Sequence, residues 1–271
     1  PHNIFFVTPL NPFWKTFFEH LGHNIVLSSP TNKEILKKGL ELCVDDACLP
    51  IKVFHGHVAN LKDKVDIIFV PRIISIEPRE YICPKFLGLP DMIKNSIPGI
   101  SNILDTELNL YKGKSNMMKH VLNLGKILNI NQSRVLFAYY KAANALRQFE
   151  AMMIKNSAFP QDVMDKKQYI MKGPCHKVGA NKLKVLLLGH YYNIYDDYIS
   201  MDLIRKLRKL NIQLITSEMV TRREIQEGIK KLSKDMFWTL GKKTIGTAFY
   251  YLENKKVDGV IHVASFGCGP D

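Results

Sequence analysis

Three widely separated cysteines are the residues of this sequence best suited to chemistry: Cys48, Cys83 and Cys268. Each lies within two residues of a proline or glycine, which is typical of a loop at the end of a helix or strand. A thiolate is both a nucleophile and a ligand for soft metals. Cys48 precedes an expected short helix, whose N-terminus favours the thiolate form. The three thiols are therefore the first candidates for a cofactor-binding site.

The spacing of the cysteines excludes several compact metal motifs. The sequence contains no C-x-x-C, so it has neither a zinc ribbon nor a compact ferredoxin motif. A three-cysteine site would have to be assembled by the tertiary fold, and the alternative is that these cysteines are inert core residues. The other two fit the site less well. Cys43 lies in an apolar helical stretch and Cys175 in a polar linker, and we expect both to stay away from it.

Three histidines are candidates for catalysis or proton transfer. His55 and His57 follow Cys48 closely, and His190 follows Gly189 at the end of an expected strand. Imidazoles in such places can act as proton carriers or contact metal ligands. The alternative for His55 and His57 is a helical or turn region with surface histidines. No glycine-rich phosphate loop of the G-x-G-x-x-G or Walker type is present.

The elements that would position these residues follow the same order at both ends of the chain. The first half is expected to contain a strand at 4–7, a helix at 12–21, a strand at 24–27, a capping box from Thr31 to Glu34 and a strand at 65–70. The second half is expected to contain a strand at 184–188, a helix at 197–210, a strand at 212–215, a capping box from Thr221 to Glu224 and a strand at 257–263. Alternating strands and helices predict parallel sheets with right-handed crossovers.

The predicted fold is therefore α/β, with two Rossmann-like lobes and a helical connection. The first lobe is expected over residues 1–112 and the second over 181–271, with helices and a linker over 113–180. Ligands bind at the carboxyl ends of strands in such sheets. Cys83 and Cys268 lie on loops after corresponding strands, so we expect them, with Cys48, to converge in the cleft between the lobes.

Composition narrows the class of protein. The 271 residues are 46% apolar and 23% charged, which is typical of a globular protein. The five cysteines are an odd number, and the chain is long enough to need no disulfide scaffold, so a reducing, cytoplasmic compartment is expected. No apolar run is long enough for a membrane span, and no signal peptide is evident. The absence of an initiator Met is compatible with a fragment or a processed product.

The formal net charge of +13 raises the question of an acidic partner. The lysines and arginines are spread along the chain, and the densest run, at 205–209, lies on an expected helix whose other face is apolar. Such a run is typical of a solvated helix face, and no aromatic platform accompanies it. We therefore expect no nucleic-acid partner; a phosphate-bearing substrate or an acidic protein remains open.

Several segments together resemble a known family. In the first half they are 45–52 (DDACLPIK), 55–57 (HGH) and 81–91 (YICPKFLGLPD). In the second half they are 188–196 (LGHYYNIYD), 237–241 (FWTLG) and 266–271 (FGCGPD). The chain is similar over nearly its whole length to the acyl-CoA dehydratase activase-related proteins. These in turn are similar to the D component of 2-hydroxyglutaryl-CoA dehydratase and to benzoyl-CoA reductase subunits.

The resemblance implies a 4Fe–4S cluster held by Cys48, Cys83 and Cys268, with one iron left open. It also implies a partner, an ATP-hydrolysing activase of the actin/Hsp70-like class that supplies a low-potential electron for reductive, anaerobic chemistry on an acyl-CoA or another small substrate. A covering helix is expected after Cys268, where the chain ends, so the second lobe is expected to be truncated.

Two other functions remain open from the sequence. One is a two-lobed binding module that holds a small molecule and no metal, and the other is a zinc-thiolate protein. Metal analysis discriminates between all three functions.

Overall fold

A computed structural model describes residues 3–4, 11–113, 115–164, 183–266 and 268. The fold is mixed α/β with small parallel sheets, as the sequence predicts. The chain divides into two compact units: unit 1 is Pro1–Leu146 with Phe237–Thr239, and unit 2 is Arg147–Met236 with Leu240–Asp271. Compactness alone does not define a lobe, so the boundaries expected at residues 112 and 181 stay a prediction.

Unit 1 contains short parallel strand pairs and the first group of helices. Its helices are α1 (Asn11–His20), α2 (Lys33–Leu42), α3 (Leu49–Leu61), α4 (Pro84–Ser96), α5 (Asn116–Ile127) and the first part of α6 (Gln132–Asn156). Its strands are β1 (Asn3–Ile4), β2 (Asn24–Ile25), β3 (Ile68–Phe69), β4 (Arg72–Ser75), β5 (Ile103–Leu104) and β6 (Glu107–Asn109). The parallel pairs are β1 with β2, β3 with β5, and β4 with β6.

The strand expected at 65–70 is observed as β3, and a second strand, β4, follows it before Cys83. Backbone hydrogen bonds from Val70 N to Leu104 O and from Arg72 N to Thr106 O carry the ladder of β3 and β5 on into β4 and β6. Cys83 therefore follows β4, whereas the sequence placed it after the preceding strand. Residues 5–7 of the first expected strand lie outside the described residues.

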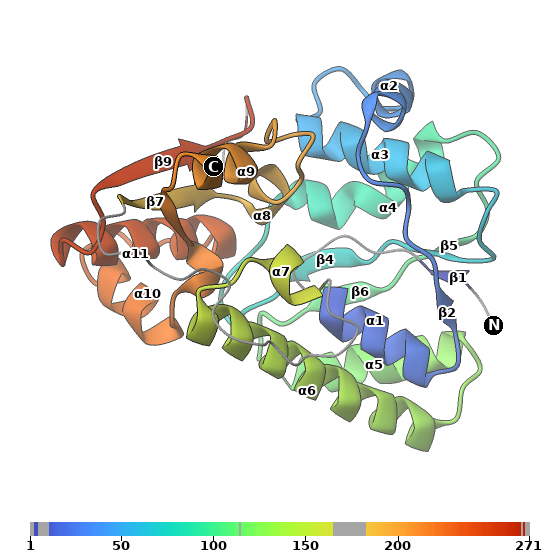
Figure 1. Cartoon of the computed structure of the whole chain (residues 1–271). Helices are drawn as coiled ribbons and strands as arrows, with labels where there is room; N and C mark the ends of the chain where they lie inside the picture. The colour runs from blue at the N-terminus through green and yellow to red at the C-terminus, as the bar shows by residue number, and fades with distance from the viewer. Residues whose placement is uncertain (1–2, 5–10, 114, 165–182, 267, 269–271) are drawn as a thin grey trace. The chain divides into compact units, whose positions relative to one another are not determined.

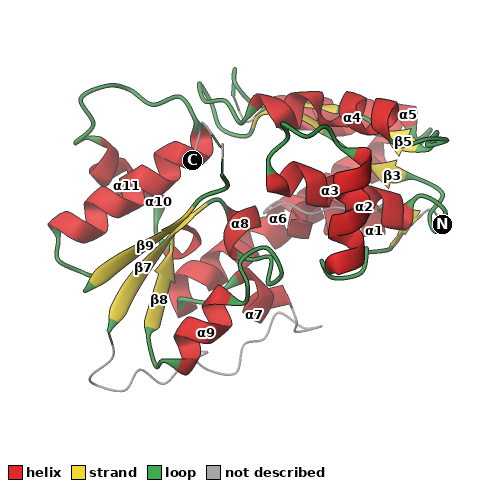
Figure 2. Cartoon of the chain, turned by 90° about the horizontal axis from the view of Figure 1, so that it is seen from above, coloured by secondary structure: helices red, strands yellow, loops and turns green. Residues whose placement is uncertain are grey.

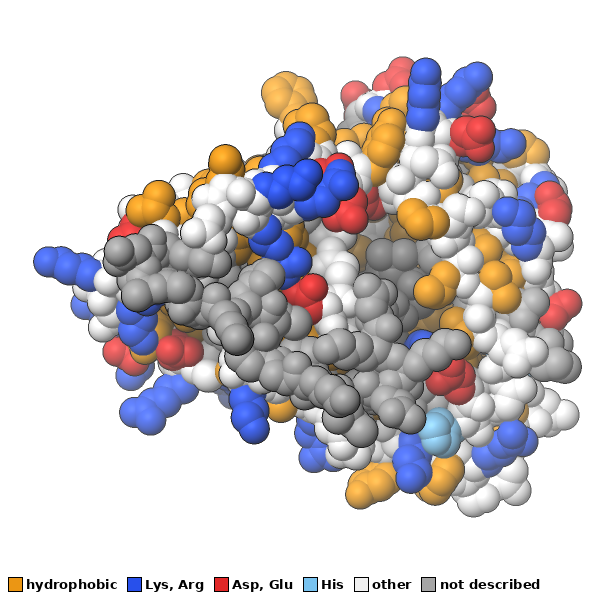
Figure 3. All heavy atoms as spheres, in the orientation of Figure 1, with side chains coloured by type: hydrophobic (Ala, Val, Ile, Leu, Met, Phe, Trp, Pro, Cys, Tyr) orange, Lys and Arg blue, Asp and Glu red, His pale blue; other side chains and the backbone are white. Residues whose placement is uncertain are grey.

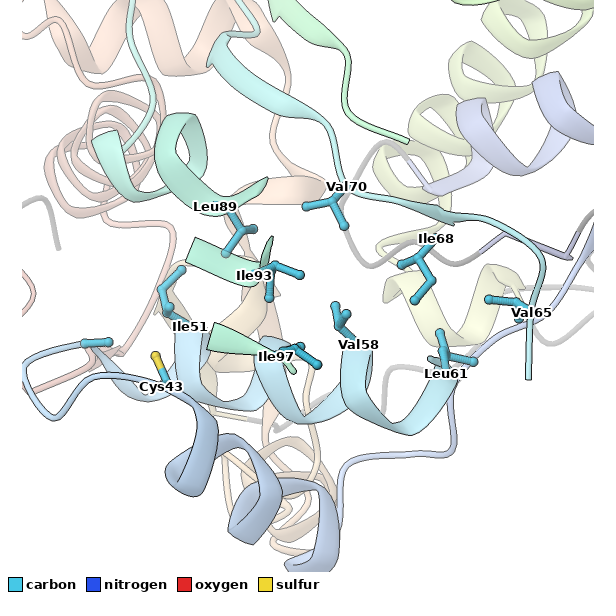
Figure 4. Close-up of a cluster of buried hydrophobic side chains, with 11 residues drawn as sticks. Cys43, Ile51, Val58, Leu61, Val65, Ile68, Val70, Leu89, Ile93 and Ile97 are labelled. Atoms are coloured by element: carbon cyan, nitrogen blue, oxygen red, sulfur yellow. The ribbon is translucent and has the colours of Figure 1, made fainter. Parts of the chain in front are cut away.

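Two apolar clusters hold unit 1 together. In the first, the side chains of Trp14, Phe17 and Phe18 on α1 are at most 1% exposed, and Trp14 packs on Phe69 of β3 with ring centroids 4.7 Å apart. The second cluster joins α3 and α4 to β3, and Figure 4 shows its side chains converging from these elements. Burial of such large apolar side chains is the main force that fixes α3 and α4.

Unit 2 is built on one three-stranded parallel sheet. Its strands are β7 (Lys184–Gly189), β8 (Gln213–Thr216) and β9 (Gly259–Val263), in the order β8-β7-β9. Its helices are the rest of α6, α7 (Pro160–Met164), α8 (Tyr191–Ile194), α9 (Leu203–Lys209), α10 (Arg222–Ile229) and α11 (Thr239–Glu253), with a 3₁₀ turn at Ser217–Met219. Figure 2 shows α9 on one side of this sheet and α10 with α11 on the other.

A close-packed helix pair occurs in each unit at the corresponding place. Helices α2 and α3 lie side by side (Figure 1), and a Cβ added to Gly56 would lie 2.0 Å from Ile35 O. Helices α10 and α11 meet in the same way, since a Cβ added to Gly246 would lie 2.6 Å from Ile225 O. Only glycine permits backbones to approach this closely. The repeated crossing supports the duplicated order of elements inferred from the sequence.

The two expected capping boxes have different outcomes. In the second, the Thr221 side chain accepts from Glu224 N and the Glu224 carboxylate accepts from Thr221 N, so the box is confirmed. In the first, the prediction is wrong: Asn32, not Thr31, caps α2 by accepting from two backbone N–H groups. The Thr31 hydroxyl instead lies 2.9 Å from His57 Nε2.

Among the helices that the structure describes, none combines the length and the apolar character of a bilayer span.

On the face drawn in Figure 3, basic side chains are scattered among acidic, apolar and uncharged ones.

Candidate functional site

Cys48 and Cys83 occupy equivalent local positions in unit 1. Cys48 is the N-cap of α3 and Cys83 is the N-cap of α4, and each helix has a proline at its first or second position. Proline suits the first turn because its fixed φ fits the helix and its missing N–H would be unpaired there. Both cysteines are partly exposed. Two thiols therefore sit at the positive ends of two helix dipoles, where negative charge is stabilised.

A tight turn holds Cys48 between α2 and α3. Ala47 N donates to Val44 O across 3.1 Å, and the Lys52 ammonium group donates to Asp45 O across 2.7 Å. The glycine crossing of α2 and α3 fixes both ends of this turn. The position of Cys48 thus follows from helix packing rather than from a flexible loop.

Arg72 of β4 fastens the helix that begins after Cys83. Its guanidinium group makes two hydrogen bonds to the Asp91 carboxylate on α4, 2.6 and 2.9 Å long, and one of 2.7 Å to Asp105. A bidentate pair of this kind fixes orientation as well as distance. Hydrogen bonds to Arg72 lower the pKa of Asp91, so the carboxylate stays charged at neutral pH.

The segment before Cys83 pairs with a distant part of the chain that belongs to the same unit. Tyr81 N donates to Phe237 O across 2.7 Å, and Thr239 N donates to Tyr81 O across 2.9 Å. The Tyr81 ring stacks on Tyr111 with centroids 4.8 Å apart. These contacts fix the backbone two residues before the thiol.

Cys268 follows the last strand of the unit 2 sheet. Its backbone N–H donates to Ser265 O, and the Ser265 hydroxyl donates to Asn193 Oδ1 across 2.8 Å. Asn193 lies in the short helix α8 that follows β7, and Gly189 at the end of β7 is paired with Val263 at the end of β9. Cys268 is thus located past the carboxyl ends of parallel strands, where ligands bind in open α/β sheets.

His55 and His57 are not surface histidines, which was the alternative that the sequence left open. Both lie within α3, and their side chains are 1% and 7% exposed. His55 Nδ1 donates to Ile51 O across 2.8 Å, while its Nε2 is buried with no hydrogen-bond partner among the described residues. Burial lowers the pKa of His55, so the ring is neutral in the folded chain at neutral pH. His57 lies 2.7 Å from the Ser28 hydroxyl and 2.9 Å from that of Thr31.

His190 has the position that the sequence predicts, at the carboxyl end of β7. It is the N-cap of α8, its side chain is 3% exposed, and its Nδ1 lies 2.6 Å from the Tyr192 hydroxyl. The helix that it caps carries Asn193, whose side chain accepts a hydrogen bond from Ser265 in the segment before Cys268. In unit 2 the fold therefore brings the loops of His190 and Cys268 to one edge of the sheet.

The two remaining cysteines were expected to lie apart from the site. Cys43 is the C-cap of α2, is 8% exposed, and shares an apolar cluster with Cys48. Burial raises the pKa of the Cys43 thiol, and the nearby charge of Cys48 raises it further. Cys43 therefore lies close to Cys48. Cys175 falls outside the described residues.

A buried polar group that sequence reasoning missed lies at the carboxyl end of β8. Glu218 accepts hydrogen bonds from the Tyr195 hydroxyl at 2.6 Å and from the Lys243 ammonium group at 3.2 Å. Burial acts to raise the pKa of Glu218, but Lys243 and Tyr195 outweigh it, and the net shift is downward. The three residues are distant in sequence, so no local motif could have indicated the group.

The thiols expected to form one site belong to both units, Cys48 and Cys83 to unit 1 and Cys268 to unit 2. Among the residues with described positions, no three His, Cys, Asp or Glu side chains lie close enough together to hold one metal ion. The chemistry of the donors nevertheless fits an iron–sulfur cluster, since partly exposed thiols at helix N-termini are suited to bind soft metals as thiolates.

The fold and the thiols define a class: parallel α/β proteins of two units that carry cysteines at helix N-termini and past a sheet edge. Within that class, the chain belongs to the family described as the CoA enzyme activase uncharacterised domain (DUF2229), whose model matches residues 2–220. The matched range includes Cys48 and Cys83, whereas Cys268 lies beyond it. No curated protein matches the chain.

Proposed function

We propose that this chain is an iron–sulfur component of a CoA enzyme activase system, with a 4Fe–4S cluster bound by Cys48, Cys83 and Cys268. The observation that carries the proposal is the repeated N-cap: two partly exposed cysteines cap two 13-residue helices inside the matched family domain, and each helix has a proline at its first or second position. A thiol at a helix N-terminus is stabilised as the thiolate, which is the form that binds metal.

The three thiolates would hold three irons of the cluster and leave the fourth open. Three protein ligands suit a cluster that binds substrate or solvent better than one that only stores electrons. The bound cluster would supply a low-potential electron for reductive chemistry. Cys48 and Cys83 would present thiolates at the positive ends of α3 and α4, which offsets the negative charge of a thiolate-bound cluster.

The histidines would have different roles. His190, on the loop next to that of Cys268, would carry a proton at a nitrogen held by the Tyr192 hydroxyl. His57 would orient the segment before α2 through the hydroxyls of Ser28 and Thr31. His55 is buried and neutral, and it would act through the packing of α3 rather than on a substrate.

The family name supports a partner and a class of substrate. A protein of a CoA enzyme activase system would receive its electron from an ATP-hydrolysing activase of the actin/Hsp70-like class and act on an acyl-CoA or a related small molecule. The electron donor and acceptor would meet in a transient complex.

Metal analysis of anaerobically purified protein tests the proposal. Iron and sulfide are expected in the wild-type chain, with broad visible absorption, and both should be lost in Cys48→Ala, Cys83→Ala and Cys268→Ala. The matched controls Cys43→Ala and Cys175→Ala should retain them. Zinc without iron would identify a zinc-thiolate protein instead, and a chain without metal that still binds a small ligand would identify a binding module.

A further inference from the structure

We propose that Cys43 and Cys48 form a redox-active pair, in which a peroxide converts the two thiols into an intramolecular disulfide whenever no metal holds Cys48. Cys43 was expected to lie apart from the site, and it takes no part in the proposed cluster. The proposal is based on the placement of two helix ends, on the burial of Cys43 beside the partly exposed Cys48, and on the packing around both.

The backbone brings the two residues together. Cys43 ends α2, Cys48 begins α3, and the four residues between them form a turn closed by the hydrogen bond from Ala47 N to Val44 O. Both cysteines have extended backbone angles, with ψ of 152° and 155°. The ends of this turn, Val44 and Ala47, lie within about 7 Å, and the two cysteines flank them. A disulfide needs Cα atoms about 4.4–6.8 Å apart, and the apolar cluster that both cysteines join keeps them close together.

The packing holds this geometry in place. Helices α2 and α3 cannot slide apart without opening the glycine contacts of their crossing, where a Cβ on Gly39 would lie 1.9 Å from Lys52 O. Cys43 and Cys48 share one apolar cluster, and Figure 4 shows the Cys43 sulfur pointing toward the first turn of α3, near Ile51.

The two thiols differ in access, which assigns their roles. Cys48 is partly exposed, so a peroxide in solution can reach it. Cys43 is 8% exposed, so it is protected from solvent but adjacent to Cys48. Redox-sensitive cysteines typically occur in such an arrangement. The accessible thiol is oxidised first, and the nearby thiol then attacks it to form a disulfide.

The chemistry balances with the peroxide as the only oxidant. The Cys48 sulfur attacks one oxygen of hydrogen peroxide, the O–O bond breaks, and a sulfenic acid and one water are formed. The Cys43 sulfur then attacks the Cys48 sulfur, the S–O bond breaks, and the hydroxyl leaves with the Cys43 proton as a second water. Two thiols are oxidised to one disulfide, and one peroxide is reduced to two waters.

One consequence rests on the proposed function. If Cys48 is a cluster ligand, the disulfide removes one thiolate from the ligand set, and the oxidised chain cannot take up a cluster until it is reduced. The link would also protect Cys48 from irreversible oxidation while the cluster is absent.

Peptide mapping tests the pair directly. The full chain, treated with a chelator and then with hydrogen peroxide, is denatured, alkylated with a maleimide and digested with trypsin. Both cysteines fall in one tryptic peptide, residues 39–52, which has no internal Lys or Arg. We expect that peptide to be lighter by two hydrogens and unlabelled. Cleavage before Asp45 or Asp46 should leave two pieces that separate only after reduction.

Variants provide the controls. Cys83→Ser should leave the linked peptide unchanged, and Cys43→Ser should drive Cys48 to the sulfinic acid, because no resolving thiol remains. Circular dichroism checks that both variants fold. A doubly labelled peptide after peroxide, a Cys48–Cys83 link, or an unreactive Cys48 in Cys43→Ser would each overturn the pair. The readout does not involve iron, so a linked peptide from a chain that binds no iron would separate this proposal from the proposed function.

Discussion

The buried imidazole of His55 links the stability of the chain to pH. Its folded pKa lies below that of an exposed histidine because of burial, so folding favours the neutral ring. The stability gained from the neutral ring is complete above the unfolded pKa, about 6.5, and is lost as pH falls through the folded value. We expect the thermal unfolding midpoint to fall as pH decreases from 7 to 5, as measured by circular dichroism.

The matched variants isolate this effect. His55→Gln keeps a side-chain donor for Ile51 O but cannot ionise, so its midpoint should depend less on pH over that range. His262→Gln, at an exposed position on β9, should retain the wild-type slope. Equal slopes for the wild type and His55→Gln would show that His55 is not the titrating group.

Lys243 compensates the buried charge of Glu218. Breaking a fully buried ion pair costs about 3–5 kcal/mol, and Lys243 is partly exposed, so we expect Lys243→Ala to lower the unfolding free energy by about 2 kcal/mol at pH 7. The loss should shrink at acid pH, as the pH falls through the lowered pKa of Glu218, because a protonated Glu218 needs no cation. Urea unfolding at pH 7 and over an acid pH series measures it. As a control, Lys231→Ala removes the exposed pair with Glu253 and should cost less than about 1 kcal/mol.

For individual residues, the sequence predicted where some side chains lie along the chain better than which other side chains they contact. A proline two residues after Cys48 is typical of a helix start, so the sequence placed this thiol before a helix. Cys83 was expected only on a loop after a strand, and the helix that it begins was not predicted. The burial of His55 and His57 could not, because it depends on α3 lying between α2 and α4. The hydrogen bonds of Glu218 could not be predicted either. Tyr195 lies at the end of α8 and Lys243 lies in α11, and only the fold brings them to Glu218.

Among the elements, the crossing of α2 and α3 is the one most sensitive to a single atom. A Cβ at Gly56 would lie 2.0 Å from Ile35 O, so the helices must separate to admit it. We expect Gly56→Ala to lower the unfolding free energy by about 1–3 kcal/mol, as for other overpacked cores. Urea unfolding monitored by circular dichroism measures the change.

Gly88 in α4 provides the matched control for this substitution. A Cβ there meets nothing within 4 Å. Alanine has the higher helix propensity, so Gly88→Ala should raise the unfolding free energy by up to about 1 kcal/mol. A loss of stability at Gly88 similar to that at Gly56 would mean that steric contact is not the cause.

The two capping boxes show how far element ends can be predicted. Both sequences read threonine, two residues, glutamate and isoleucine, and only the second forms the box. In the first, Asn32 is an equally good cap one position later. The Thr31 hydroxyl lies at His57, which is 26 residues further along the chain in α3, and a local pattern cannot include such a competitor.

At the scale of the whole molecule, the net charge of +13 attracts the protein to polyanions such as DNA. We expect only weak, salt-sensitive binding to DNA, because phosphate contacts alone lose affinity steeply with salt. Fluorescence anisotropy with a labelled duplex should show binding at about 50 mM salt that disappears near 150 mM. Binding that persists at the higher salt and depends on base sequence would contradict this expectation.

The duplicated order of elements was visible in the sequence because hydrophobic runs and turn residues repeat at both ends. The structure adds the shared glycine crossing, which no periodicity reveals, since a single glycine within a helix has many possible causes. The division into units could not be read in this way. It depends on residues 237–239, which are distant in sequence from the rest of unit 1.

That division constrains how the protein can be dissected. A recombinant fragment that ends at residue 146 omits Phe237–Thr239, and with it the backbone acceptor and donor that flank Tyr81. The edge next to Cys83 would be left unpaired, as on an exposed strand that recruits another chain. Such a fragment is expected to self-associate, and a peptide of the α11 start, added in trans, should restore a monomer in size-exclusion chromatography.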